Sequence, residues 1–202
     1  MKRYIYIILS AVLLLAAVQA NAQVGRRWYI DAGWQFNATP SNEIAESAQG
    51  WGAYLEGGYY LTPNLAVGGF VNYGTNNKYF PERTFEYEDG SALTTDFARS
   101  LFQIPFGATL RYRFMWNKVQ PYVEAKIGAN YAEHSTYMST FRLYENSWGF
   151  YASPEIGVAL YPFNRTNLGF QIGVYYAYAT NRSKPYGMNG INNVGFKLGL
   201  SF

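Results

Sequence analysis

The chain has 202 residues, which fits one domain, and it contains no cysteine, which excludes disulfides and cysteine-ligated metal centres. Charged residues make up only 14% of the chain, against roughly 25% in ordinary soluble domains, whereas aromatic residues reach 19%. The formal net charge of +3 is not gathered into a basic face, so nothing favours nucleic acid as a partner.

The first predicted element is a secretory signal peptide over residues 1–22. Lys2 and Arg3 give a positive start, an apolar run extends from Ile5 to Val18, and the Ala-Asn-Ala sequence ending at Ala22 supplies the small residues of a cleavage site. The run is shorter than the ~20 apolar residues of a membrane helix, which disfavours an uncleaved anchor. We expect cleavage near Ala22 and a mature domain over residues 23–202.

The mature chain alternates apolar with polar or small residues at a period of two, which is typical of β-strands. Eight such runs cover residues 28–36, 51–61, 65–73, 102–112, 122–131, 155–161, 168–176 and 194–202. Short turns join every second pair, and the four long, polar connections are residues 37–49, 74–99, 132–147 and 179–192. This layout predicts an all-β fold, an eight-stranded antiparallel up-and-down transmembrane β-barrel with both termini on the short-turn, periplasmic side.

Two prolines, Pro105 and Pro154, fall within predicted strands. Proline has no N–H to donate to a neighbouring strand, and a closed barrel has no edge strand on which to place it. We therefore expect a local bulge or a missing hydrogen bond at each proline.

The more polar face of the strands carries a set of charged and amide side chains. These are Asp31, Glu56, Gln103, Arg111, Glu124, Lys126, Glu155 and Lys197. Eight strands enclose a space just wide enough for side chains to fill, so we expect these groups to pair there as a polar plug. On the lipid side, Lys126 alone would cost ~2–4 kcal/mol near the membrane midplane. Two alternatives stay open: a gated pore or proton path through these charges, and a soluble ligand-binding barrel with its apolar face inside.

Five tryptophans lie near strand ends or turns, where aromatic residues of membrane barrels meet the lipid headgroups. The predicted interfacial residues are Trp28, Trp34, Trp51, Trp116 and Trp148.

The segments Gln103-Ile104-Pro105-Phe106-Gly107 and Pro121-Tyr122-Val123-Glu124-Ala125, together with a last strand ending at Phe202, carry a family resemblance. The mature chain resembles the small outer-membrane β-barrels that include OmpX, OmpW and the OmpA membrane domain. The resemblance implies the cell outer membrane as location, its lipids as surroundings, a monomer, and no peptidoglycan-binding domain. It also implies a signal for the barrel-assembly machinery, formed by Phe196, Leu198, Leu200 and Phe202. Because the family is diverse in activity, it predicts fold and location rather than function.

No catalytic residue, metal site or cofactor is predicted. The one histidine, His134, lies near Glu133, Ser135 and Ser139, and a lipid-modifying hydrolase built on Ser and His is the alternative to a solvated loop histidine. Acidic residues in the second long connection suit weak cation binding or, in our preferred interpretation, a solvated loop. They are Glu82, Glu86, Glu88, Asp89 and Asp96.

The function that we expect is a structural and surface-interaction role through the four long extracellular loops, since loops commonly carry binding function. In the second loop, Tyr79, Phe80, Phe85 and Tyr87 would form an adhesive surface or extend the hairpin beyond the membrane. The alternative is a narrow porin-like channel for small or apolar solutes. No ligand for the loops can be named from the sequence.

Overall fold

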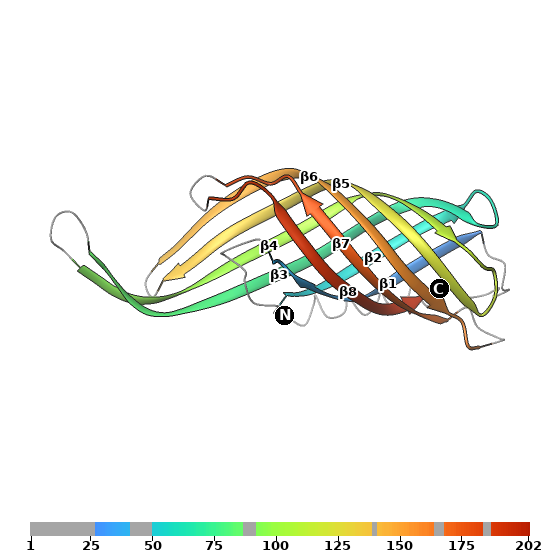
Figure 1. Cartoon of the computed structure of the whole chain (residues 1–202), viewed down its shortest axis with the longest axis horizontal. Helices are drawn as coiled ribbons and strands as arrows, with labels where there is room; N and C mark the ends of the chain where they lie inside the picture. The colour runs from blue at the N-terminus through green and yellow to red at the C-terminus, as the bar shows by residue number, and fades with distance from the viewer. Residues whose placement is uncertain (1–26, 41–49, 87–91, 139–140, 164–167, 184–186) are drawn as a thin grey trace, which may run out of the picture.

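The computed structural model describes residues 27–40, 50–86, 92–138, 141–163, 168–183 and 187–202, so the predicted signal peptide lies outside the described residues. Eight strands form the structure (Figure 1). They are β1 (Trp28–Ala38), β2 (Gly50–Tyr60), β3 (Leu65–Glu86), β4 (Ala92–Arg113), β5 (Val119–Met138), β6 (Phe141–Leu160), β7 (Gly169–Ala179) and β8 (Ile191–Ser201). Among these residues, no helix has the length and apolarity that a membrane crossing requires.

The eight strands close into a barrel in which each strand pairs antiparallel with its sequence neighbour and β8 pairs with β1. At the closing seam Asp31 lies opposite Ser201. Just below that pair, Ile30 and Phe202 exchange two backbone hydrogen bonds, with N···O distances of 3.2 and 2.9 Å. The predicted fold class is therefore confirmed.

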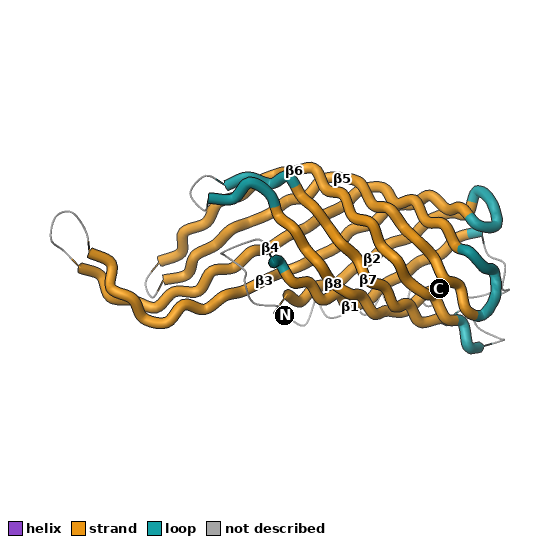
Figure 2. Tube along the Cα trace, viewed as in Figure 1, coloured by secondary structure: helices purple, strands orange, loops and turns teal. Residues whose placement is uncertain are grey.

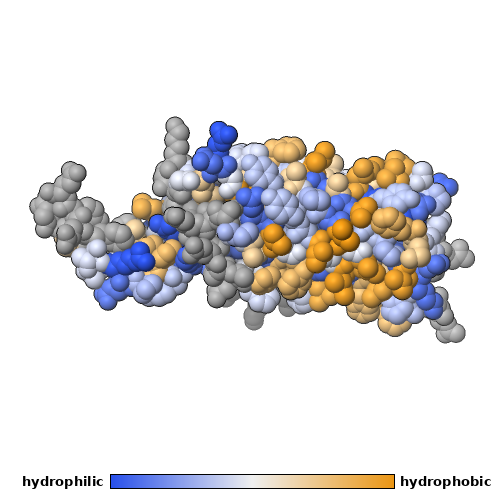
Figure 3. Space-filling view, in the orientation of Figure 1, coloured by the Kyte–Doolittle hydropathy of each residue, from blue (hydrophilic) through white to orange (hydrophobic). Residues whose placement is uncertain are grey.

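Side chains alternate between the barrel interior and its outer wall as the sequence pattern predicts. In β7 every second residue from Gly169 to Ala179 is buried, and the residues between them are exposed. Large apolar side chains such as Ile127, Ile156 and Val174 are more than half exposed on the wall. Figure 3 shows such hydrophobic residues gathered over the barrel wall. An outward apolar band around an inward polar face is the arrangement of a barrel in lipid, and it does not fit the soluble alternative.

Four strands extend well beyond the rest of the barrel (Figure 2). β3 and β4 have 22 residues each and β5 and β6 have 20 each, whereas the other four strands have 11. The prediction that residues 74–99 and 132–147 are loops is thus wrong, because most of them continue the strands. The second hairpin extends beyond the closed part of the barrel, and its position outside the membrane stays a prediction. A strand with water on both faces lacks the apolar alternation that identified the other segments.

Both prolines interrupt a ladder without shifting its register. Between β6 and β7 the pairs Ala152–Tyr178 and Glu155–Tyr175 are in one register, and the two pairs between them are missing. The hydroxyl of Ser153 donates to the carbonyl of Tyr176 at 2.8 Å, where the N–H of a residue other than Pro154 would donate. Pro105 leaves a similar gap between β3 and β4. The missing bond that we expected is observed, and the bulge is not.

Candidate functional site

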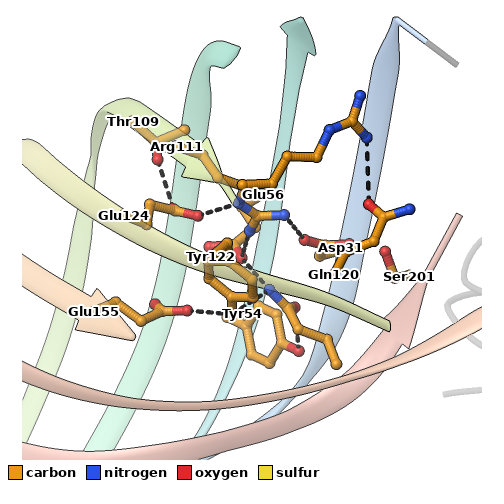
Figure 4. Close-up of polar contacts among 12 residues, drawn as sticks. Asp31, Tyr54, Glu56, Thr109, Arg111, Gln120, Tyr122, Glu124, Glu155 and Ser201 are labelled. Atoms are coloured by element: carbon orange, nitrogen blue, oxygen red, sulfur yellow. Dashed lines mark hydrogen bonds and ion pairs between the residues drawn. The ribbon is translucent and has the colours of Figure 1, made fainter. Parts of the chain in front are cut away.

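The centre of the barrel holds a buried network of ions (Figure 4) built around Arg111 of β4. Its guanidinium donates to Asp31 at 2.6 Å, to Glu56 at 2.7 Å and to Glu124 at 2.5 Å. The rings of Tyr29 and Tyr122 lie 3.9 and 4.4 Å from the guanidinium carbon. Three carboxylates and two aromatic faces therefore surround one cation, which compensates for its removal from water.

Two lysines connect the remaining carboxylates. Lys126 of β5 lies 2.6 Å from Glu56 and 2.8 Å from Glu155. Lys197 of β8 bridges the same two glutamates, at 2.6 Å from Glu155. The structure thus brings together in one cluster all seven charged residues that the sequence placed on the inner face, four acids and three bases.

Neutral side chains complete the hydrogen bonding around the ions. The hydroxyl of Tyr122 donates to Glu155 at 2.7 Å and accepts from the amide of Gln171 at 2.7 Å, and the same amide donates to Glu56 at 3.1 Å. The hydroxyl of Tyr54 donates to Gln171 at 3.0 Å. Buried polar groups that are bonded on several sides form a rigid unit and leave little room for solvent.

Two glycines make room for these tyrosines. A Cβ atom added at Gly157 would collide with the hydroxyl of Tyr122, and one added at Gly199 would collide with the hydroxyl of Tyr54. The glycines on the inner face therefore have a packing role that the alternation alone does not reveal.

The three glutamates of the network have the spacing of a metal-binding group. Oxygen atoms of Glu56, Glu124 and Glu155 lie within 4.8 Å of one another. Each of these carboxylates is already paired with Arg111, Lys126 or both, so cations of the protein itself supply the compensating charge. The arrangement does not fit a dedicated metal centre.

Two further layers fill the barrel on the side of the long hairpins. The first is aromatic, with the rings of Phe70 and Tyr151 at 5.6 Å and Tyr175 in the same apolar cluster. The second consists of amides, in which Asn130 donates to Gln103 at 3.4 Å and to Asn181 at 2.9 Å. Gln103 therefore lies one layer away from the ions, although the sequence grouped it with them.

A third set of groups closes the barrel near the short turns. The guanidinium carbon of Arg113 lies 3.6 Å from the ring centre of Tyr60 and 4.6 Å from that of Trp116. Its Nε donates to the carbonyl of Pro63 at 2.7 Å, and its Nη1 donates to Gln120 at 3.2 Å. Arg113 was not among the predicted lumen residues, although it continues the inward alternation of Thr109 and Arg111.

The sequence predicted that His134 is a solvated loop residue, and this prediction is wrong. It lies on β5, fully buried, and pairs across the ladders with Leu101 of β4 and Glu145 of β6. The physical reason is the extension of β4, β5 and β6, which turns the predicted loop into sheet. Nearby, the hydroxyl of Ser135 donates to Glu133 at 3.0 Å and accepts from Arg142, and Ser139 lies outside the described residues.

Apart from Trp116, the predicted interfacial and assembly residues lie along the outer wall of the barrel. Trp28 starts β1 and Trp116 lies in the turn between β4 and β5. Trp51 and Trp148 are exposed and pair with Phe36 and Tyr131, towards the long-hairpin end, whereas Trp34 lies in the middle of β1 opposite Leu198. Phe196, Leu198 and Leu200 are exposed along β8, and Phe202 is half-buried. These positions do not test either predicted role.

The apolar–polar alternation of the strands already indicated most of the site residues that the sequence-based list of lumen residues left out. Tyr29, Tyr54, Tyr122 and Gln171 alternate with apolar outer residues and so belong to the inner face. Asn181 had no such signal, because it follows β7 in a segment without alternation. The sequence thus indicates which side chains point inward but not which of them are partners across the lumen.

Comparison with solved structures shows the same fold in one outer-membrane surface protein and finds weaker likenesses to others. Neisserial surface protein A is 17% identical, with a TM-score of 0.53, over 86% of this chain and 95% of that one. Ail of Yersinia pestis is 16% identical, with a TM-score of 0.48, over 87% and 97%. The outer membrane protease OmpT of Escherichia coli is 14% identical, with a TM-score of 0.48, over 76% and 63%.

No curated protein matches the chain. A model of the outer membrane protein beta-barrel domain family matches residues 8–202. With the closed eight-stranded barrel, its apolar wall and its ionic interior already described, this match shows that the chain belongs to the outer membrane protein β-barrel family.

Proposed function

We propose that this protein is a non-conducting, non-enzymatic barrel that holds an extended β-sheet outside the outer membrane as a surface for contact with partners. One observation carries the proposal: the barrel interior is filled, while β3 to β6 continue past the closed part of the barrel. Thr75 is the last β3 residue paired with β2, and the strand continues to Glu86, which is about 35 Å further at the usual rise per residue.

The packing of the interior supports the proposal against the channel alternative. The ionic, aromatic and amide layers are stacked along the barrel, so a solute would have to displace several bonded groups in succession. In planar bilayers we expect the purified, folded protein to show no regular conductance steps, and Arg111→Ala to leave that result unchanged. Regular steps in the wild type that change with Arg111→Ala would contradict the proposal.

The surroundings of Ser135 support the absence of Ser–His chemistry. Its hydroxyl is held by Glu133 and Arg142, and because Ser135 and His134 are consecutive residues of a strand, their side chains point to opposite faces. We expect a strain carrying His134→Ala to keep the lipid composition of the parent strain, with heat-modifiable gel migration as the check that the barrel is folded. A change in lipid acylation would favour the enzyme.

The test of the surface role is removal of the longest hairpin. Deleting residues 78–95 leaves the paired, closed part of the barrel intact. We expect the variant to fold, as judged by heat-modifiable migration, and to lose most of the adhesion that the wild type confers on cells. The matched control shortens the β5–β6 hairpin by residues 136–143. Unchanged adhesion after the first deletion would contradict the role of β3 and β4.

A further inference from the structure

The outer wall of the closed barrel has a groove that runs across β1, β2 and β3. It is open to the outside of the barrel and has a volume of about 390 Å³. The apolar side chains of Ile30, Leu55 and Val71 line it. Its floor is the backbone of β2 and β3, because Gly57 and Gly69 lie directly opposite each other there and neither has a side chain. We call this depression the glycine groove.

Gly57 and Gly69 are the two outward-facing glycines of the described strands, since the alternation places the other strand glycines on the inner face. Inner glycines such as Gly157 and Gly199 make room for tyrosines. At Gly69 the strand pairing is regular, and an added Cβ atom would lie 3.4 Å from the carbonyl oxygen of Gly107, at the edge of ordinary van der Waals contact. The packing of the protein itself therefore does not require a glycine there. A glycine within a strand weakens it and often marks the close approach of a ligand.

A cation and a phenol lie at the end of the glycine groove nearest the short turns. Tyr59 follows Gly57 on the same face of β2, roughly 7 Å further along the strand. The Nη1 atom of Arg27 donates to the hydroxyl of Tyr59 at 3.4 Å. The carbonyl of Arg27 accepts from the N–H of Tyr60 at 2.5 Å, which fixes its backbone at the start of β1. The Arg27 side chain is exposed, and among the described residues no carboxylate pairs with it.

We infer that the glycine groove binds one phospholipid of the periplasmic leaflet, with an acyl chain over Gly57 and Gly69 and the phosphate at Arg27 and Tyr59. A guanidinium can donate two parallel hydrogen bonds to a phosphate, and a tyrosine of a membrane barrel suits the level of the lipid headgroups. An acyl chain seated in the groove contacts the wall on more sides than a chain on a convex surface, and these dispersion contacts add up. The site lies in the closed part of the barrel and does not depend on the proposed surface role.

The combination of features favours a phospholipid over other occupants. A free phosphate would bind to Arg27 but would leave the apolar groove unused. A second copy of the barrel would fill the groove with apolar side chains but would supply no anion to Arg27. A phospholipid carries an anion and an acyl chain in one molecule, so it matches the exposed cation and the groove beside it.

Native mass spectrometry of the purified, folded protein in a neutral detergent tests the inference by titration with phosphatidylglycerol. We expect one lipid to bind before any further adduct forms. A diacylglycerol with the same acyl chains lacks the phosphate and should bind at least about fivefold more weakly. Inorganic phosphate lacks the chain and should not compete. Full competition by inorganic phosphate would overturn the inference, because the groove would then have no part in binding.

The acyl-chain half of the site is tested by filling the groove. In Gly69→Leu the new side chain occupies the space above the β2–β3 backbone, and the open surroundings of Gly69 should let the barrel fold, as heat-modifiable migration checks. We expect lipid binding at least about fivefold weaker. The matched control is Ala125→Leu, at an exposed outward alanine of β5 away from the groove, which should change binding by less than about twofold.

The phosphate half is tested by Arg27→Gln, which should also weaken binding at least about fivefold, with Lys118→Gln at another exposed basic residue near the short turns as the control. Equal binding by Gly69→Leu and Ala125→Leu would overturn the inference. So would equal losses in Arg27→Gln and Lys118→Gln, since overall charge would then explain the binding. A lipid-free dimer that Gly69→Leu dissociates would assign the groove to a second copy instead.

Discussion

At the scale of single residues, the barrel depends on buried charges that compensate one another. Lys197 is almost fully buried and its ammonium lies between Glu56 and Glu155. Removing one member of a buried ion pair leaves a charge without a partner, which typically costs about 3–5 kcal/mol. Each buried charge of the network is therefore compensated by the opposite charges around it. Each of these residues contributes more to stability than an exposed ion would.

We predict that Lys197→Met lowers the free energy of unfolding by about 3 kcal/mol or more, because two glutamates then share one fewer cation. Lys118→Met, in the exposed turn before β5, is the control and should change it by less than about 0.5 kcal/mol. Urea titration of the folded barrel in lipid vesicles measures both. Equal stabilities of the two variants would mean that the ions are solvated inside the barrel.

The sequence predicted the members of this network but not its pairs. Each charged residue alternates with apolar neighbours, so its inward direction follows from a period of two. The partners depend on the stagger of the strands around the barrel, which no local pattern encodes. Arg111, for example, meets Asp31 on β1, a strand far away in the sequence and across the lumen. The inward direction of Gln103 led to its assignment to the same group, but its side chain lies in the amide layer.

At the scale of the strand, Pro154 shows how a local defect is repaired. The carbonyl of Tyr176 faces a residue without an N–H, and the neighbouring hydroxyl of Ser153 donates to it. The sequence predicted the missing ladder bond, because proline has no donor. It did not predict the repair, because nothing in the alternation identifies Ser153 as the replacement.

A double-mutant cycle tests this repair. Ser153→Ala should destabilise the wild-type barrel by about 1 kcal/mol, because the Tyr176 carbonyl loses its donor. In a Pro154→Ala background the restored backbone N–H can donate, so the same substitution should cost much less. Unfolding free energies of the four proteins give the coupling. Identical costs in both backgrounds would show that the hydroxyl does not replace the ladder bond.

The sequence predicted eight strands, but it did not predict the full lengths of β3 to β6. In β5, apolar and polar residues alternate from Val123 to Tyr131, but the segment from Glu133 to Thr136 is polar on both faces. Such a segment resembles a loop until its neighbours are known. Pairing with β4 and β6 along its whole length keeps it in the sheet.

At the scale of the whole molecule, one sheet passes through two environments. Around the closed barrel the outer face is apolar, and further along the same strands the extended hairpins carry mixed side chains (Figure 3). If the closed part lies in hydrocarbon and the hairpins lie in water, outward residues of similar exposure on β5 and β6 must meet different solvents. Ile127 and Tyr144 form such a pair, at 56% and 64% exposed.

We predict that a spin label at Ile127 collides with oxygen dissolved in lipid and is shielded from a water-soluble nickel complex, because Ile127 lies opposite Ala108 and Ala152 in the closed barrel. A label at Tyr144, opposite Ser135 in the extended hairpin, should show the reverse. Power-saturation measurements in vesicles distinguish the two collision partners. Lipid contact at Tyr144 would place the hairpins against the membrane, and the surface role would then lose its basis. Water contact at Ile127 would contradict the orientation of the barrel wall itself.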